Sequence, residues 1–194
     1  CFECPRIPAT GRLLIVANHP SGALDALALL DLVGRVRRDV RIVANDMLSL
    51  IEPLSDLLLP VRILGGSAGA DSLRGIERAL ENEECVIVFP AGEVSRLGPR
   101  GVRDTRWRRG FLRFARKTAT PVLPIRIEAR NSSLFYGVSA LYRPASTALL
   151  AREMYARRHR PLHLRIGPLL DVRAGDDTEA ALRSVRRTLY ALCK

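Results

Sequence analysis

The sequence is poor in aromatic residues, in cysteine and in long apolar stretches, and each shortage excludes a class of protein. Phe, Trp and Tyr make up 5% of the chain, which argues against single-stranded nucleic-acid binding, where bases stack on aromatic rings. The four cysteines include one C-x-x-C pair, Cys1 and Cys4, but no second pair follows, so we expect no metal site. No run of about 18 apolar residues occurs, and we expect no transmembrane helix.

What the chain does contain suits one packed domain. It has 194 residues, of which 47% are hydrophobic, and we expect a single domain over 1–194. Cys85 opens an apolar run and is expected to be a reduced core residue. The chain begins at Cys1 rather than Met, so we expect it to be N-terminally incomplete, with any membrane anchor outside it.

Charge is strongly biased toward cations. The net charge is +11, which indicates an anionic partner such as lipid headgroups, coenzyme A phosphates or an acidic carrier protein. A solvated, Arg-rich surface accounts for the same excess without any partner. Charge alone does not choose between these interpretations.

Short apolar runs alternate with amphipathic ones along the whole chain. This alternation predicts an α/β domain with a mostly parallel or mixed central sheet flanked by helices. The expected strands are Leu13–Ala17, Val40–Ala44, Leu59–Leu64, Val86–Phe89, Val122–Ile127 and Leu162–Ile166. The expected helices are Ala23–Val36, Met47–Leu58, Ala70–Glu81, Arg106–Lys117, Ala145–Arg157 and Thr178–Leu192, the last capped by Asp176 or Asp177. The Gly-rich and Arg-rich segment Ser95–Thr105 is expected to be a mobile loop.

The segment Asn18–Asp25 carries the first chemical signal. It follows a predicted strand and precedes a predicted helix, so it lies where α/β sheets gather their chemistry. Asp25 in the first helical turn would orient His19 and stabilise its imidazolium, making His19 a general base toward an alcohol or amine. The alternative is a helix-capping turn at Pro20-Ser21-Gly22 beside an incidental His, with Ser21 as the cap.

This segment resembles the glycerolipid acyltransferase superfamily, which includes 1-acylglycerol-3-phosphate acyltransferases. The family signature is Asn-His, four residues and Asp, whereas five residues separate His19 from Asp25 here (an HX5D motif). The longer spacing is similar to the divergent hemolysin-like or ornithine-lipid acyltransferase branch. The resemblance implies a fold like that of glycerol-3-phosphate acyltransferase.

Later segments resemble further blocks of the family. Val88–Arg96 is similar to its Phe-Pro-Glu-Gly-Thr-Arg-Ser block, with Ala91 in place of the Glu and a Glu two positions on. Trp107–Gly110 is similar to a Phe-Lys-x-Gly segment, and Thr120–Ile125 to a proline-flanked strand. By this resemblance the catalytic residues are His19 and Asp25. The substrate-binding residues are Asn18, Ser21, Gly22, Arg62, Phe89, Pro90, Gly92, Glu93, Ser95, Arg96, Arg108 and Gly110.

The resemblance implies direct acyl transfer. His19 would deprotonate the hydroxyl of a lysolipid acceptor, which attacks the thioester of acyl-CoA or acyl-carrier protein without any cofactor. The acceptor would be lysophosphatidate, another lysophospholipid or lyso-ornithine lipid. Backbone amides at Ser21–Ala23 or at Gly92 are expected to bind the oxyanion. An anionic membrane surface is the expected partner, with the protein peripheral on its cytoplasmic face.

Two other functions remain open on sequence. Gly65-Gly66-Ser67-Ala68-Gly69 matches the nucleophile elbow of serine hydrolases, with Ser67 as nucleophile. Against it, His163 falls inside a predicted strand rather than on a loop. A non-catalytic basic domain for membrane or nucleic acid is the other alternative, although no nucleic-acid motif is present.

Overall fold

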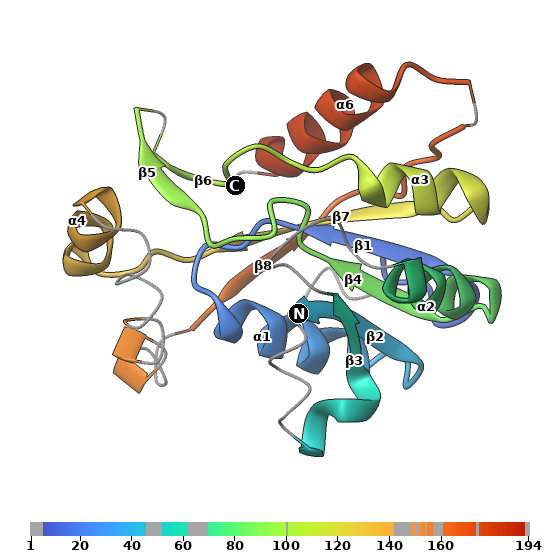
Figure 1. Cartoon of the computed structure of the whole chain (residues 1–194), viewed down its shortest axis with the longest axis horizontal. Coiled ribbons are helices and arrows are strands. Elements are labelled where there is room, and N and C mark those ends of the chain that lie inside the picture. The colour runs from blue at the N-terminus through green and yellow to red at the C-terminus, as the bar shows by residue number, and fades with distance from the viewer. Residues whose placement is uncertain are drawn as a thin grey trace.

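A six-stranded sheet runs through the centre of the molecule, with helices on both of its faces (Figure 1). The computed structural model describes residues 6–45, 52–61, 70–99, 101–141, 149, 152–153, 155–156, 161–173 and 175–192. The strand order is β3-β2-β4-β1-β7-β8. These strands are β1 (Leu13–Ala17), β2 (Val40–Asn45), β3 (Leu58–Val61), β4 (Cys85–Val88), β7 (Val122–Glu128) and β8 (His163–Ile166).

The first five strands of this order are parallel and β8 alone is antiparallel. The sheet is therefore of the mostly parallel, mixed kind that the alternating pattern predicted. β1 lies inside the sheet, between β4 and β7, with Leu14 opposite both Val86 and Val122. All five residues of β1 are fully buried, as expected for a parallel strand covered on both faces. Parallel strands also place their carboxyl ends at one edge, which is where the segment after β1 begins.

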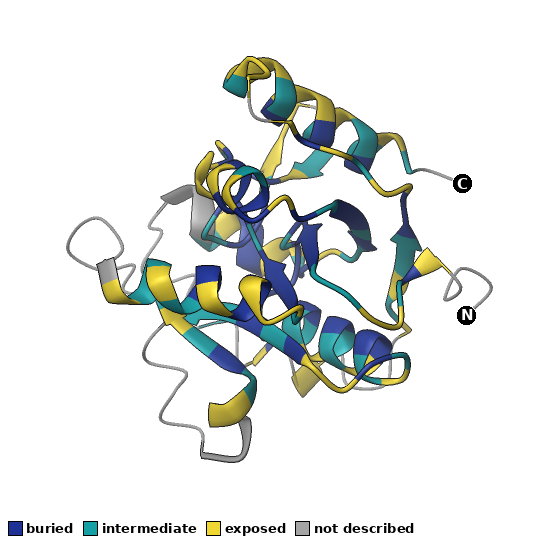
Figure 2. Cartoon of the chain, turned by 90° about the vertical axis from the view of Figure 1, so that its right-hand side faces the viewer, coloured by how far each residue is buried: buried dark blue, intermediate teal, exposed yellow. Residues whose placement is uncertain are grey.

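Alternate residues of β1 point into two separate cores. Leu13, Ile15 and Ala17 pack with the inner side of α1, whereas Leu14 and Val16 pack with α2, α3 and α6 on the other face. Figure 2 shows the buried sides of these helices facing the sheet. The helices are α1 (Ala23–Gly34), α2 (Ala70–Glu81), α3 (Gly110–Lys117), α4 (Ser133–Leu141) and α6 (Thr178–Ala191).

Most predicted elements are confirmed, and α2 has the bounds that were expected. α6 is capped by Asp177, whose side chain accepts hydrogen bonds from the amides of Glu179 and Ala180. Cys85 is fully buried, and burial raises the pKa of its thiol to about 12. His163 lies in β8, as predicted, and is exposed there. Within the described ranges no helix is both long and apolar enough to cross a bilayer.

Other predictions were wrong or fall outside the described residues. The described part of the helix expected at Met47–Leu58 is a 3-10 helix, Glu52–Leu57, followed directly by β3. α3 begins at Gly110 rather than Arg106, and α4 was not predicted at all. The loop expected at Ser95–Thr105 holds a β-hairpin of β5 (Arg96–Gly98) and β6 (Gly101–Arg103). Parts of two predicted elements, Leu59–Leu64 and Ala145–Arg157, and the residues Arg62 and Ser67, lie outside the described residues.

Candidate active site

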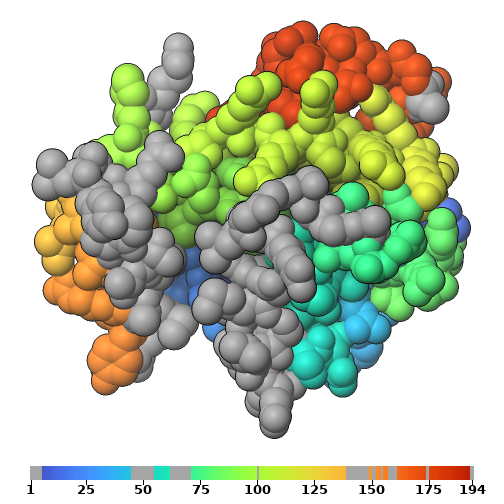
Figure 3. Space-filling view, viewed as in Figure 1, coloured from blue at the N-terminus to red at the C-terminus, as the bar shows by residue number. Residues whose placement is uncertain are grey.

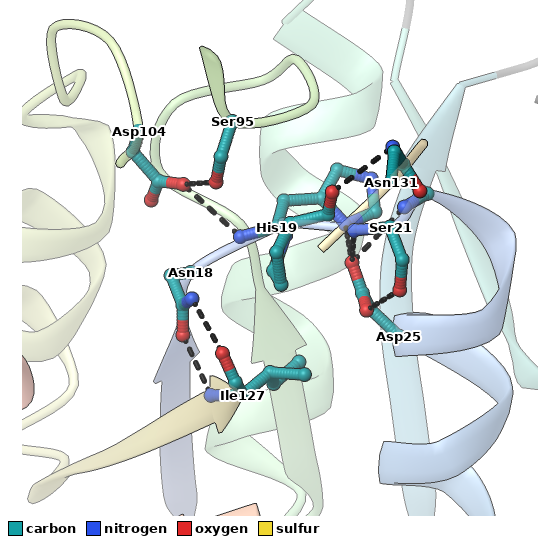
Figure 4. A network of polar contacts seen from close by, with 10 residues as sticks. Asn18, His19, Ser21, Asp25, Ser95, Asp104, Ile127 and Asn131 are labelled. Atoms are coloured by element: carbon teal, nitrogen blue, oxygen red, sulfur yellow. Dashed lines mark hydrogen bonds and ion pairs between the residues drawn. The ribbon is translucent and has the colours of Figure 1, made fainter. Parts of the chain in front are cut away.

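The segment after β1 is fixed to the neighbouring strand by Asn18. Its side-chain carbonyl accepts from the Ile127 amide at 2.7 Å, and its side-chain amide donates to the Ile127 carbonyl at 2.9 Å (Figure 4). Asn18 is 5% exposed. Its side chain therefore joins the ends of β1 and β7, which is a structural role, and the expectation that Asn18 binds substrate stays a prediction.

Asp25 is held by the turn that precedes its own helix. Its Oδ2 accepts from the amides of Ser21 at 2.7 Å and Gly22 at 3.0 Å, and Oδ1 accepts from the Ser21 hydroxyl. Gly22 has a φ of +83°, a conformation that costs a residue with a Cβ substantial strain. Ser21 is 1% exposed, so its hydroxyl orients Asp25 rather than facing a substrate.

His19 lies beside this carboxylate and keeps part of its ring accessible. Its Nδ1 is 3.1 Å from Oδ2 of Asp25, although the two are not aligned as a hydrogen bond. The His19 side chain is 18% exposed, while that of Asp25 is fully buried. The ring stacks on Phe89 at the end of β4, with centroids 4.0 Å apart. An imidazole in this position has one nitrogen toward a carboxylate and the other available to a reactant.

The segment that follows β4 supports the same region from the other side. The Arg108 amide donates to the Pro90 carbonyl at 2.9 Å. Gly92 has a φ of +68°, and a Cβ there would lie 3.6 Å from the guanidinium carbon of Arg108. The sequence therefore brings Phe89, Pro90, Gly92 and Arg108 together as predicted, with the arginine packed over the glycine.

Glu93 and Arg96 are partners of residues within the protein. The Glu93 carboxylate accepts from the Thr105 hydroxyl at 2.8 Å and from the Arg96 guanidinium at 3.2 Å. Both side chains are partly buried. The Glu93 carboxylate is therefore bonded on both sides by residues of the same loop. These contacts also place Arg96 in an ion pair with Glu93, while its expected role in substrate binding stays a prediction.

Asp104 is the residue of this site that sequence analysis missed. It is 4% exposed, and its carboxylate accepts from the His19 amide at 3.1 Å, from the Ser95 hydroxyl and from the Trp107 indole at 2.8 Å. The Ser95 amide in turn donates to the His19 carbonyl at 2.7 Å. Figure 4 shows Asp104 and Asp25 on opposite sides of His19. The only sequence signal was an acidic residue within a basic segment.

Three of the amides expected to bind an oxyanion are already engaged. Those of Ser21 and Gly22 donate to Asp25, and that of Gly92 donates to the Phe89 carbonyl at 3.0 Å. An amide that already donates to an acceptor within the protein is a weak donor to an oxyanion that forms in the transition state. These three amides are therefore engaged within the protein, whereas the expectation also included the amide of Ala23.

Two cavities lie beside the segments that contact His19. One of about 530 Å³ lies beside the ends of β1 and β7. The other, of about 810 Å³, lies between α6 and the segment before α3. The first is lined by Asn18, Pro20, Leu24, Arg103, Arg126 and Tyr190, among others. The second includes the predicted substrate-binding residues Glu93, Arg108 and Gly110. Neither cavity includes His19 itself, so side-chain contacts rather than hollow volume define the site.

Comparison with known proteins identifies the class to which this arrangement belongs. A sequence model of the acyltransferase family matches residues 3–191. The chain therefore belongs to the acyltransferase family.

Two curated relatives carry the same name. The chain is 29% identical over 180 residues to a lyso-glycine lipid O-acyltransferase of Phocaeicola vulgatus, covering 89% of this chain and 64% of the relative. It is 29% identical over 168 residues to a lyso-glycine lipid O-acyltransferase of Bacteroides thetaiotaomicron, covering 83% of this chain and 61% of that relative. The chain thus spans less than two thirds of the length of these relatives.

A solved structure shares the fold. The crystal structure of the 1-acyl-sn-glycerophosphate (LPA) acyltransferase PlsC from Thermotoga maritima superposes with a TM-score of 0.62 at 19% identity. The match covers 97% of this chain and 67% of that one. The expected glycerolipid acyltransferase fold, with its sheet between layers of helices, is thereby confirmed.

Proposed function

We propose that this chain transfers a fatty acyl group from a thioester to the hydroxyl of a lysolipid, with His19 as general base. The observation that carries the proposal is the approach of the His19 Nδ1 to a fully buried Asp25 carboxylate, at 3.1 Å. A carboxylate on that side favours the tautomer with a proton on Nδ1. Nε2 is then left as the proton acceptor.

Every proton moved in the transfer is accepted and returned by His19. Nε2 takes the proton of the acceptor hydroxyl while the oxygen attacks the thioester carbonyl carbon. The carbon–sulfur bond of the tetrahedral intermediate then breaks, and the imidazolium returns its proton to the leaving thiolate. The products are an ester and a free thiol. Asp25 stabilises the imidazolium throughout, and Phe89 keeps the ring in one plane.

The substrates follow from the relatives and from charge. Both curated relatives are named for a lyso-glycine lipid, so a lysolipid with an amino-acid headgroup is the proposed acceptor. Arg103 and Arg126 line the cavity next to Asn18 and Pro20, where guanidiniums suit a carboxylate or a phosphate. Acyl-CoA and acyl-carrier protein are the proposed donors, and no step requires a metal or a bound cofactor.

The test is release of free thiol from palmitoyl-CoA or from acyl-carrier protein. Each donor is offered with lyso-glycine lipid, lyso-ornithine lipid or lysophosphatidate, and without acceptor. We expect release to depend on the lysolipid and to fall about a thousandfold or more in His19→Ala. A wild-type protein that releases no thiol in response to any of these acceptors would overturn the proposal.

A second histidine provides a matched control. His163 is exposed in β8, so His163→Ala should retain wild-type turnover. An equal loss of thiol release in His19→Ala and His163→Ala would show that the effect at His19 is not specific. The same pair tests the hydrolase alternative, because a triad using Ser67 would require a later histidine such as His163 rather than His19.

A further inference from the structure

The β5–β6 hairpin and α4 form one packed unit at the carboxyl edge of the sheet. Val94, just before β5, packs with Phe135 and Tyr136 of α4 in a cluster separate from the two main cores. Val102 of β6 packs against the same cluster. The hairpin therefore has a defined position against α4.

The outer side of this unit exposes leucines that neither core uses. Leu97 in β5 is 55% exposed and Leu134 in the first turn of α4 is 51% exposed. Gly98 and Pro99 at the hairpin tip are exposed as well. Figure 3 shows the hairpin projecting from the surface, and in the same view Figure 1 places α4 beside it. Exposed leucines on two adjoining elements favour contact with an apolar phase.

Cations line the cavity next to this unit. Arg103 in β6 and Arg130, between β7 and α4, are both exposed, and both line the cavity of about 530 Å³ described above. Within the described part of the chain, neither forms an ion pair; the Arg103 guanidinium lies 4.6 Å from the centroid of the Tyr190 ring. Together with a net charge of +11, they make this side complementary to an anionic surface. Segments that combine exposed apolar side chains with cations are typical of proteins that bind the interface of an anionic bilayer.

The same unit is bonded directly to the catalytic segment. Ser95 immediately precedes β5 and donates to the His19 carbonyl, and Asp104 immediately follows β6 and accepts from the His19 amide. On the α4 side, the Asn131 side chain donates to the Pro20 carbonyl at 3.2 Å. Whatever holds the hairpin and α4 in place therefore also sets the position of His19.

We propose that the hairpin tip and the first turn of α4 form a docking surface for an anionic lipid bilayer. Leu97 and Leu134 enter the headgroup region while the exposed Arg130 contacts anionic headgroups. The inference rests on the proposed function, because the lysolipid acceptor resides in such a bilayer. Docking through this surface holds His19 at a constant depth, where the hydroxyl of an embedded lysolipid reaches it without leaving the membrane.

The first experiment measures binding by co-sedimentation with vesicles of phosphatidylglycerol and phosphatidylcholine, and with phosphatidylcholine alone. Leu97→Asp and Leu134→Asp are tested singly and together, with thermal melting to confirm folding. The matched control is Leu169→Asp: Leu169 is 48% exposed and precedes Leu170, which pairs with Val122 at the opposite end of β7. We expect the double variant to lose at least tenfold in binding to anionic vesicles and the control to bind as wild type.

The second experiment compares two forms of the same acceptor. With lysolipid embedded in vesicles, the double variant should lose turnover in proportion to its binding. With lysolipid dispersed in detergent micelles, it should keep wild-type turnover. The proposal is overturned if the wild-type protein does not sediment with anionic vesicles or if the leucine variants bind as wild type. It is also overturned if Leu169→Asp lowers vesicle binding as much as the double variant does.

Two further outcomes identify the source of a failure. If the double variant binds vesicles normally and loses turnover only with acyl-carrier protein as donor, this surface docks a protein. That result would overturn the bilayer assignment. Leucine-dependent vesicle binding by a wild-type protein that transfers acyl groups to no acceptor would overturn the proposed function and leave the docking surface standing.

Discussion

Two buried aspartates hold His19 from opposite sides, and they differ in how far along the chain their partners lie. Asp25 binds the amides and hydroxyl of Ser21 and Gly22, within four residues of itself. Asp104 binds the His19 amide, 85 residues away in sequence. Asp25 faces the imidazole, while Asp104 contacts only the backbone of His19. A local turn thus orients the ring, and a long-range contact places the residue that carries it.

Asp25→Asn is expected to give the largest effect on turnover. The amide oxygen can still accept from the Ser21 and Gly22 amides, so the fold should persist. It carries no charge to stabilise the imidazolium and permits the wrong tautomer, which lowers kcat by about 10³- to 10⁴-fold. Thiol release at saturating substrate measures this, with circular dichroism as the folding control. A kcat within tenfold of wild type would remove Asp25 from the proposed mechanism.

Asp104→Asn should have an intermediate effect that combines turnover and stability. One amide oxygen cannot reproduce all three hydrogen bonds, and a buried donor left unpaired costs about 1–3 kcal/mol in the free energy of unfolding. A small displacement of His19 lowers kcat roughly 10- to 100-fold. Because Asp104 does not touch the imidazole, the pH dependence of kcat should match wild type.

The exposed Asp171, paired with Arg173 on the surface, supplies the control for Asp104. Asp171→Asn should change neither kcat nor the urea midpoint. A shifted pH profile in Asp104→Asn would contradict a purely positioning role and make the two buried aspartates functionally alike.

Asp39→Asn should have the smallest effect and affect stability alone. The buried Arg37 guanidinium donates two hydrogen bonds to Asp39, and these lower the pKa of Asp39 below its usual value. A lowered pKa stabilises the fold above the ordinary aspartate range, and that contribution is lost as pH falls through the lowered pKa. Asp39 is 43% exposed, so solvent screening reduces the expected loss to about 1 kcal/mol at neutral pH.

Urea denaturation at neutral and at acidic pH tests this prediction, with kcat as the second readout. The stability difference between Asp39→Asn and wild type should shrink toward zero once Asp39 is protonated. A difference that grows on acidification, or a change in kcat, would be inconsistent with an aspartate that acts only on folding.

The same contrast in distance explains what the sequence could predict. His19 and Asp25 lie in one short segment between a strand and a helix, so their spacing in the sequence was enough to predict that they lie close together. α2 was predicted with its observed bounds because a polar cluster and a turn delimit its amphipathic pattern. The sheet followed from the apolar runs of its strands, since a buried parallel strand needs little information beyond continuous hydrophobicity.

The missed features depend on partners far away in the chain. β5 and β6 are three residues each, too short for a period-2 pattern to indicate a strand. α4 contains Gly137 and residues that favour strands, and its helix is stabilised by the packing of Phe135 and Tyr136 rather than by intrinsic propensity. The Asp104 contacts to His19 and Tyr190 cross the fold, and nothing in the adjacent sequence specifies them.

The interior position of β1 also sets the order in which the site around His19 can form during synthesis. His19 and Asp25 leave the ribosome early, but β1 gains its neighbours only when β4 and then β7 have been made. The contact of Asn18 requires Ile127, so a nascent chain that ends before that residue contains His19 and Asp25 without this link to β7. Pairing strands so distant in sequence is slow and late in folding. Synthesis interrupted in this interval therefore yields a chain that contains His19 and Asp25 with their local turn but lacks the long-range contacts that fix its position.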